Sequence, residues 1–265
     1  MFAILRHHSL FHQLFLSIII VALLGLALNW FFMFRHGVMT SSEYLTQGNT
    51  QLAVNIAESI SHGIRHLVHH MEQTAALLRY VELSTPIVHE ILQSTIHSSL
   101  LEELILLDDK LNIRAAIPSD ATLSLSPELL GEVFITGQPH STEVIFKDDI
   151  GSISLIVPIM RNGQAIGLLV APNICCSVLA WPVAIKDTHM FLLDDRANVI
   201  SHSEPEHVGV NLTGIDIVRA GSNTPLSITD IIAQPETQVV RYQWQGRARE
   251  TVLTPVPGTT WWFGL

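Results

Sequence analysis

The sequence predicts an α+β protein in which an N-terminal transmembrane helix and a long stalk helix precede two antiparallel-sheet subdomains. Three observations carry this prediction: one long apolar run near the start, a Pro-free stretch with helical periodicity, and short strand-like runs separated by Asp- and Gly-containing turns. We expect a short cytoplasmic N-terminus at 1–13, the transmembrane helix at 14–34, the stalk helix at 38–82, a distal subdomain at 83–180 and a proximal subdomain at 181–265.

Composition excludes several classes of protein. The chain has 265 residues, with 24 acidic against 14 basic side chains and a formal charge of -10. Such a field repels phosphate backbones, so no nucleic-acid partner is expected. Cys175 and Cys176 are the only cysteines and stand side by side, so they provide neither a disulfide framework nor a Cys-x-x-Cys metal or redox motif.

The apolar run extends from Leu14 to Phe34 and is interrupted only by Ser17 and Asn29. About 20 apolar residues span a bilayer as a helix, so the run predicts a membrane segment. The alternative is a cleaved signal peptide, whose apolar region usually has only about 7–15 residues and ends in small residues. The length of the run and the aromatic residues at its end favour an uncleaved anchor.

The orientation of this anchor follows from weak charge asymmetry. Arg6 and Arg35 balance each other, which leaves the N-terminal amine and nearby histidines to favour an inside N-terminus. We therefore expect residues after about 36 to lie outside the cytoplasm.

A long helix is predicted to leave the membrane, because no Pro occurs from Val38 to Tyr80. Its apolar residues recur at helical spacing and form a narrow stripe. The members of this stripe are Leu52, Ile56, Ile60, Ile64, Leu67 and Met71. The stripe could pack on the following domain or on a twin helix in a homodimer. A second helix is predicted from Pro86 to about Ser98.

The rest of the chain changes to strand periodicity. Residues 102–118 predict a hairpin, 127–137 a helix that ends at Gly137, and 141–146, 152–160 and 164–171 three further strands. Together they predict a five-stranded antiparallel sheet with helices to one side. Residues 188–203 repeat the strand, Asp-rich turn and strand of 102–118, which indicates an internal duplication.

The second unit continues with a short helix near Glu204–His207. The sequence then predicts a hairpin that turns at Gln245 and Gly246, and a final strand that begins at Trp261.

This order of elements resembles the double Cache sensor module of bacterial transmembrane receptors, which has two PAS-like subdomains. The matching stretches are TGQPHSTEVIFKDDIGSISLIVPIMRNGQAIGLLVAPN (136–173), FLLDDRANVISHSEPEHVGVNL (191–212) and PVPGTTWWFGL (255–265). The resemblance implies an extracytoplasmic ligand-binding input module that binds a small molecule in its distal subdomain. The signal would pass through the long helix to the membrane.

In that family a second membrane helix and a cytoplasmic kinase, cyclase or chemotaxis domain normally follow the closing Trp strand. Here the sequence stops at Leu265, so we expect the output domain or partner to be outside this chain. The alternative function is a membrane-tethered structural or interaction protein that keeps the fold without a ligand.

The resemblance also implies candidate ligand-binding residues in the distal half. Family members that capture amino acids carry Tyr, Arg and Trp ahead of an Asp. The corresponding stretch here contains Arg114 without Trp or Tyr, and Asp148, two residues after Phe146, stands in the acidic position. Arg114, Phe146 and Asp148 are therefore the expected ligand-binding residues. The alternative is a strand-edge charge for Arg114 and a solvated turn for Asp148.

No metal site is predicted, although His62, His66 and His70 have spacings at which two histidines share a helix face. His62 and His70 are separated by about 12 Å along a helix, too far to share one ion. These three histidines are weak metal candidates, and exposed stalk histidines are the plainer interpretation.

No cofactor and no catalytic residue are predicted. Ser201 and His202 stand near Asp194, but residues adjacent on a strand point to opposite faces and cannot form a catalytic triad. The sequence also has no nucleophile elbow, phosphate-binding loop or dinucleotide fingerprint. We therefore expect no enzymatic activity.

Overall fold

The computed structural model describes residues 2–265 except 84, 148–149, 177–187 and 223, and describes only the backbone of 2–22, 36–43 and 147. The chain divides into two compact units, Met1–Asn49 and Thr50–Leu265. Helix α1 (Phe2–Leu78) supplies the first unit and the first element of the second. The two predicted N-terminal helices are therefore one continuous helix in its backbone.

The membrane prediction falls in part on residues 14–22, whose side chains lie outside the described residues. Among the residues that the structure describes, no helix is both long enough and apolar enough to cross a membrane.

The distal subdomain has one layer of strands between helices. Its helices are α2 (Pro86–Ser98) and α3 (Pro127–Thr136). Its strands are β1 (Leu104–Asp108), β2 (Ile113–Ile117), β3 (His140–Ser141), β4 (Ile145–Lys147), β5 (Ile150–Arg161) and β6 (Gln164–Cys175). They form a six-stranded antiparallel sheet in the order β2-β1-β6-β5-β3, with β4 also paired to β5. The prediction of five strands was one short.

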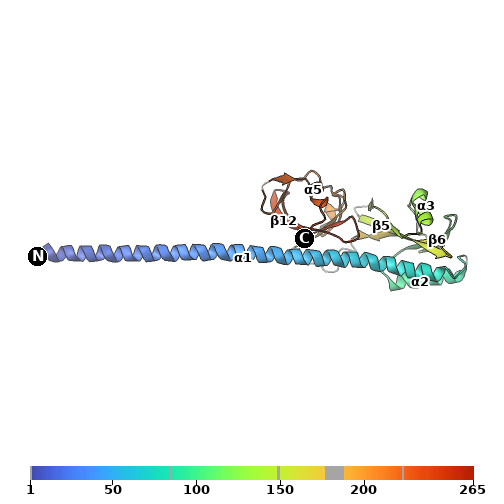
Figure 1. The fold of residues 1–265 in the computed structure, drawn as a ribbon, viewed down its shortest axis with the longest axis horizontal. Helices are drawn as coiled ribbons and strands as arrows, with labels where there is room; N and C mark the ends of the chain where they lie inside the picture. The colour runs from blue at the N-terminus through green and yellow to red at the C-terminus, as the bar shows by residue number, and fades with distance from the viewer. Residues whose placement is uncertain (1, 84, 148–149, 177–187, 223) are drawn as a thin grey trace. The chain divides into compact units, whose positions relative to one another are not determined.

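The helices lie on both faces of this sheet, so the prediction of helices to one side was wrong. Alternate residues of a strand point to opposite faces. Leu104 and Leu106 of β1 join the core that includes α1 and α2, whereas Ile105 and Leu107 join the core under α3. Figure 1 shows α2 beside α1, and α3 on the other side of β5 and β6.

Helix α3 has the ends that its sequence predicts. The side chain of Ser126 accepts a hydrogen bond from the backbone N–H of Leu129, and Pro127 occupies the first turn. Gly137 ends the helix with φ 64°, a left-handed conformation that glycine adopts without steric cost.

The proximal subdomain contains a seven-stranded antiparallel sheet in the order β10-β9-β11-β12-β13-β7-β8. Its elements are β7 (Phe191–Leu193), β8 (Val199–His202), the 3-10 helix η1 (Pro205–His207), β9 (Ile217–Arg219), β10 (Pro225–Leu226), α5 (Ile228–Ile232), β11 (Gln238–Trp244), β12 (Arg247–Pro255) and β13 (Trp262–Gly264). The hairpin that turns at Gln245 and Gly246 is confirmed. The sequence analysis missed β9, β10 and α5, although Ser227 and Asp230 form a capping box at the start of α5.

The two subdomains begin with the same hairpin turn, as the internal repeat predicted. Asp108 Oδ1 accepts hydrogen bonds from the backbone N–H groups of Lys110 and Asn112, at 2.9 and 2.8 Å. Asp194 Oδ1 accepts from Arg196 and Asn198 in the same way, at 2.9 and 2.7 Å. The residue before each asparagine has φ 61° in both turns.

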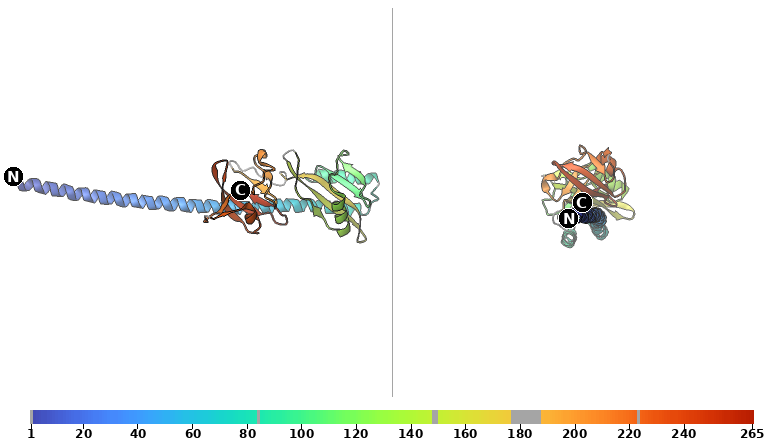
Figure 2. Two further views of the ribbon diagram at one scale, coloured as in Figure 1. Left: turned by 90° about the horizontal axis from the view of Figure 1, so that it is seen from above. Right: turned by 90° about the vertical axis from the view of Figure 1, so that its left-hand side faces the viewer.

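Helix α1 provides the core that both sheets share. Its buried side chains pack in one cluster with residues of the distal sheet and with Leu192, Ile200, Val252 and Phe263 of the proximal sheet. Figure 2 shows the two sheets following one another along the second part of this helix. The buried residues of α1 in the cluster are Ala53, Ala57, Ile60, Leu67, Met71, Ala75 and Leu78.

The stripe packs on the following domain, the first of the two arrangements that the sequence leaves open. Ile60 and Leu67 are 1% and 2% exposed in the protein's own fold, and Ile56 and Ile64 pack on the same core. A homodimer through this stripe would require its residues to leave that core, which opposes pairing there.

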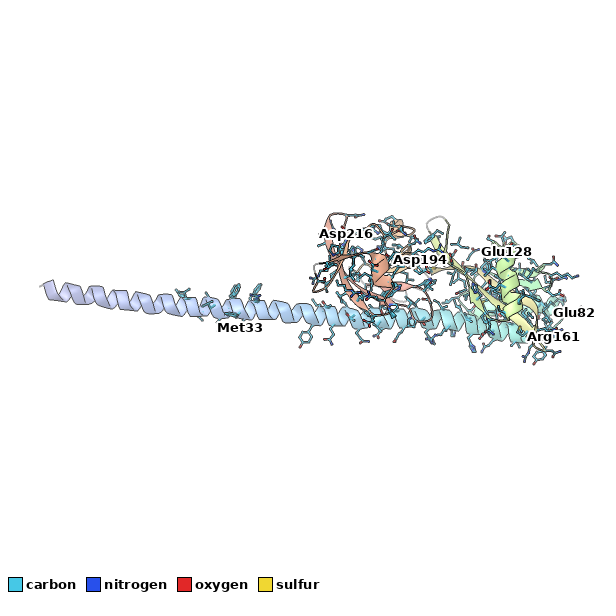
Figure 3. All side chains as sticks on the ribbon, turned by 45° about the horizontal axis from the view of Figure 1, so that its top comes forward. Met33, Glu82, Glu128, Arg161, Asp194 and Asp216 are labelled. Carbon is cyan, nitrogen blue, oxygen red and sulfur yellow. The ribbon has the colours of Figure 1, made fainter. Side chains whose placement is uncertain are left out.

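Two contacts hold β5 of the distal sheet, one to the segment after α1 and one to β8 of the proximal sheet. Arg161 donates to the backbone oxygens of Arg79 and Val81 at 2.6 and 3.2 Å, at the end of the domain where Figure 3 labels Arg161 and Glu82. Gly151 of β5 lies against β8, where a Cβ would stand 2.4 Å from the carbonyl oxygen of Ile200. Only glycine fits this approach between the subdomains.

We expect Ile60→Ala to lower the free energy of unfolding by about 2–5 kcal/mol, because it leaves a cavity in the shared core. Ser59→Ala, on the exposed side of the same turn, is the matched control and should change it by less than about 0.5 kcal/mol. Chemical denaturation of the full chain followed by circular dichroism measures both. Equal stability of the two variants would contradict the assignment of this stripe to the core.

Candidate ligand pocket in the proximal subdomain

A pocket of about 510 Å³ lies on the face of the proximal sheet that points away from α1. Phe191 and Val199 line it, whereas their neighbours Leu192 and Ile200 point to the core with α1. The remaining apolar or aromatic lining residues are Val210, Leu212, Tyr242 and Trp244. The polar lining residues are His189, His202, Glu204, His207, Gln245, Arg247 and Arg249. The pocket therefore combines apolar and aromatic walls with polar and charged side chains.

Two local structures carry the polar residues. His202 ends β8, and the following turn through η1 brings His207 back over it, with ring centroids 4.6 Å apart. On the opposite wall, the register of the β11–β12 hairpin places Arg249 beside Tyr242 and Arg247 beside Trp244. Cross-strand neighbours lie on the same face of a sheet, so all four point to the pocket side.

Glu204 is the centre of a histidine cluster. Its backbone N–H donates to His202 Nδ1 at 2.8 Å. Its carboxylate oxygens Oε1 and Oε2 lie 3.4 Å from His189 Nδ1 and 3.1 Å from His207 Nδ1. The His207 Nδ1 atom is buried and has no hydrogen-bond partner among the described residues, so its contact with Glu204 is an ion-pairing distance only.

Burial and then the neighbouring His207 lower the pKa of His202 to about 4, against the opposing charge of Glu204. The ring is therefore neutral near pH 7. Since Nδ1 accepts the Glu204 N–H, the neutral ring carries its proton on Nε2 and can donate a hydrogen bond from there.

Arg247 and Arg249 can be compared with the other arginines of the two subdomains. Arg114, Arg196 and Arg241 each have a carboxylate partner within ion-pairing distance, and Arg161 and Arg219 donate to backbone or glutamine oxygens. No such ion pair involves Arg247 or Arg249 within the part of the chain that the structure describes. Arg249 is half-buried and is close enough to Tyr242 to oppose the rise in phenol pKa that burial causes. The pocket thus holds cationic groups without an internal counter-ion.

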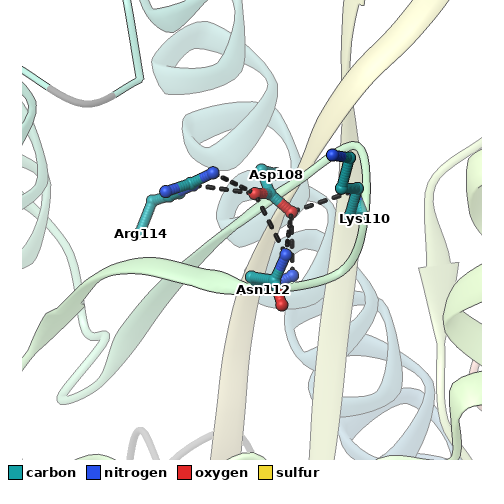
Figure 4. Close-up of polar contacts among 4 residues, drawn as sticks. All are labelled: Asp108, Lys110, Asn112 and Arg114. Carbon is teal, nitrogen blue, oxygen red and sulfur yellow. Dashed lines mark hydrogen bonds and ion pairs between the residues drawn. The ribbon is translucent and has the colours of Figure 1, made fainter.

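The structure places Arg114 in a contact of its own. Its Nε and Nη2 atoms lie 2.7 and 2.6 Å from Asp108 Oδ2, at the start of the β1–β2 turn (Figure 4). The guanidinium therefore has a carboxylate partner within the protein. This is the strand-edge role that the sequence analysis gave as the alternative.

The other expected ligand-binding residues do not join Arg114. Phe146 lies on β4, at the far edge of the sheet from β2, four strand steps or roughly 19 Å away. It lines a second cavity of about 850 Å³ between the subdomains, together with Asp194 and Trp261. Asp148 lies outside the described residues.

The three histidines of α1 are not grouped with other metal-binding side chains among the described residues. His62, His66 and His70 follow one another along α1, with ring centroids 6.5 and 4.5 Å apart. Within the described residues, the groups of three metal-type side chains that lie close together include none of them. Exposed stalk histidines, the plainer interpretation, fit this arrangement.

Ser201 and His202 point in opposite directions, as strand geometry requires. Ser201 is buried, and its Oγ has no hydrogen-bond partner within the described chain. His202 faces the pocket. The serine hydroxyl is thus not activated by its neighbour. Burial likewise raises the pKa of the Cys176 thiol, with Cys175 beside it, which keeps that thiol protonated.

Several solved structures share the arrangement of two sheets along one long helix. The ligand-binding domain of the Pseudomonas aeruginosa PAO1 amino acid chemoreceptor PctC, in complex with GABA, has a TM-score of 0.61 at 15% identity, over 84% of this chain and 98% of that one.

Two further structures agree. The ligand-binding domain of the Pseudomonas fluorescens chemoreceptor CtaA with L-isoleucine has a TM-score of 0.61 at 17% identity, over 84% of this chain and 92% of that one. The extracellular domain of the histidine kinase mmHK1S-Z2 has a TM-score of 0.62 at 15% identity, over 83% and 95%. No protein-family model and no curated protein matches the sequence. The double-sheet fold that the resemblance implied is thus confirmed.

The sequence analysis missed the proximal pocket. The spacing His-x-Glu-x-x-His at 202–207 was a signal, but the analysis used this stretch only for the resemblance. Arg247 and Arg249 gave no signal, because alternate charged residues are normal on the exposed side of a hairpin.

We expect the pKa of the Asp108 carboxyl to lie well below its ordinary value of 3.8. Burial alone would raise its pKa, but hydrogen bonds from Asn112, Lys110 and Arg114 outweigh burial and lower it to about 2. Arg114→Ala should raise this pKa only in part, because the backbone hydrogen bonds remain. NMR titration of the carboxyl carbon measures it.

The same shift gives the sign of the pH effect. A carboxyl whose pKa is lowered by folding stabilises the native state above pH 4, and this contribution is lost as the pH falls towards 2. A return of the Asp108 pKa to 3.8 in Arg114→Ala would mean that the arginine, and not the turn, holds the charge.

Proposed function

We propose that the chain is the extracytoplasmic input module of a membrane signal-transduction receptor and binds a small organic carboxylate in the proximal pocket. The observation that carries the ligand class is Arg249, a half-buried cation without an internal carboxylate partner among the described residues, in a pocket with aromatic walls. A planar guanidinium binds a carboxylate through two parallel hydrogen bonds.

The rest of the pocket supports a ligand of amino-acid or small aromatic-acid size. Its volume of about 510 Å³ lies within the range of small-molecule sites. Phe191, Tyr242 and Trp244 offer apolar surface for the body of the ligand, and His202 Nε2 offers a neutral donor. The chemoreceptor domains that share the fold are described as binding GABA and amino acids, which supports the same class here.

The position of the pocket suggests how a ligand would signal. One sheet separates it from α1: Phe191 and Val199 face the pocket, and Leu192 and Ile200, the next residues along the same strands, pack in the core with α1. A displacement of β7 or β8 by a ligand would therefore be transmitted through a close-packed core to the helix.

The localisation is part of the proposal. Its support is the apolar run at 14–34, together with the exposure of large apolar side chains from Leu23 to Phe34, all more than half exposed in the described part of that run. Such a surface is unfavourable in water and favourable in a bilayer. We propose that it anchors the chain in the inner membrane, with the sensor unit in the periplasm.

Two alternatives make different predictions. The distal assignment, with Arg114, Phe146 and Asp148, stays a competing proposal for the binding site. The other alternative is a membrane-tethered structural protein, which would bind no small molecule at all.

Arg249→Ala should weaken carboxylate binding at least tenfold. A charge-assisted hydrogen bond to a buried group contributes roughly 1.5–3 kcal/mol. A thermal-shift screen of the full chain against amino acids and other small carboxylates identifies the ligand, and calorimetry then gives the affinity. Arg241→Ala is the matched control, because Arg241 lies on the same hairpin, exposed and paired with Glu250, and should leave binding unchanged.

The same experiment separates the alternatives. If Arg114→Ala abolishes binding and Arg249→Ala does not, the distal subdomain holds the ligand. No thermal shift with any compound in the screen would favour the structural protein.

The topology is tested by reporter fusions after Leu265. Alkaline phosphatase, which is active only outside the cytoplasm, should be active at this position, and a cytoplasmic fluorescent reporter should be dark. The opposite pattern would contradict the proposed orientation. Deletion of residues 1–36 should abolish the phosphatase activity and leave the fusion protein in the soluble fraction, because the apolar run that exports and anchors the chain is then missing.

A further inference from the structure

We propose that His202, Glu204 and His207 form a binding site for a divalent transition metal ion of the zinc type. One ligand atom from each residue lies within 4.8 Å of the others. Two ligands of a tetrahedral zinc ion, each about 2.0–2.1 Å from the metal, are about 3.4 Å apart. The distance of 3.1 Å from Glu204 Oε2 to His207 Nδ1 already fits this value, so small side-chain rotations would complete the set.

An unpartnered atom supports the site. The Nδ1 atom of His207 is buried without a hydrogen-bond partner in the described residues, which normally costs free energy. The side chain is only 12% exposed, so water has little access to it. A metal ion held between His207 Nδ1 and Glu204 Oε2 would satisfy the nitrogen and the carboxylate together.

The backbone around His202 prepares that ring for either role. The Glu204 N–H donates to His202 Nδ1 at 2.8 Å, and the Glu204 carbonyl oxygen lies 3.1 Å from the same atom. If the proton stands on Nδ1 instead, Nδ1–H donates a hydrogen bond to that carbonyl, the bond from the Glu204 N–H is given up, and Nε2 becomes free to bind a metal. A second hydrogen bond of this kind orients most metal-binding histidines.

His189 offers a fourth ligand. Its Nδ1 atom lies 3.4 Å from the other carboxylate oxygen of Glu204, and its ring centroid is 6.3 Å from that of His202. Three imidazoles and one carboxylate match the preference of zinc, nickel or copper, whereas calcium and magnesium require oxygen ligands. The donor set therefore selects a transition metal.

The metal site shares the pocket of the proposed function but does not depend on an organic ligand. A bound cation would add to Arg247 and Arg249 in attracting an anionic ligand into the pocket. Because the metal can be titrated alone, the two proposals can fail separately.

The test is a zinc titration of the full chain, purified in mild detergent without a histidine tag and stripped with a chelator. Competition with a chromophoric zinc chelator should show one tight zinc ion per chain. His207→Gln and Glu204→Gln should each weaken it at least tenfold. His66→Gln, which changes an exposed histidine on α1, is the matched control and should keep the wild-type affinity.

Cobalt gives an independent signature. Co²⁺ in place of zinc should produce the strong visible bands of a four-coordinate site, and both pocket variants should lose them. Circular dichroism without metal checks that the variants fold. If His207→Gln does not fold, Glu204→Gln decides, because that carboxylate is 41% exposed and its loss leaves the sheet intact.

Unchanged zinc affinity and stoichiometry in a folded pocket variant would overturn the proposal, and so would a loss of binding in His66→Gln. Weak binding of several ions by all proteins would mean adventitious binding by surface histidines and would overturn it equally. Zinc binding with no organic ligand would leave the metal site and remove the proposed carboxylate ligand. If the protein binds a carboxylate in excess chelator but does not bind zinc, the carboxylate ligand is supported and the metal site is overturned.

Discussion

The apolar stripe of α1 is the constraint on which the rest of the unit Thr50–Leu265 depends. A single sheet must bury one face, and here both sheets bury theirs against the same helix, through Ile60, Leu67 and Met71. Because one close-packed core contains all three elements, the helix cannot move independently of either sheet. The stripe therefore supports both sheets from within the fold.

The two sheets differ in what covers their second face. In the distal sheet, Leu130 and Val133 of α3 pack on Ile105 and Ile156 and fill the space with apolar side chains. On that face of the proximal sheet, the described residues supply the five-residue helix α5 and connecting segments. A pocket with aromatic walls, two arginines and a histidine cluster lies there. This difference in cover is the reason that we place the proposed ligand on the proximal face.

The same Asp turn occurs in both subdomains, but its aspartate has different further contacts in each. Asp108 and Asp194 hold their turns with the same pair of backbone hydrogen bonds. In the distal copy the second carboxylate oxygen also binds Arg114. In the proximal copy Asp194 lines the cavity between the subdomains. A charged residue that matches a binding motif in the sequence can therefore also have a partner in its own turn.

Local rules were enough for much of the fold. The sequence by itself determined the long helix, α2, α3, both Asp turns and the Gln245–Gly246 hairpin, because periodicity, caps and turn residues act over a few neighbours. Only the tertiary structure decided that helices cover both faces of the distal sheet, that the stripe of α1 is internal, and that Arg114 and Phe146 lie on opposite edges. The tertiary structure also decided the proximal pocket. Arg249 and His202 line it together only because β12 and β8 belong to one sheet, with β13 and β7 between them. Strand order places residues that are distant in sequence side by side, and no short-range pattern encodes that order.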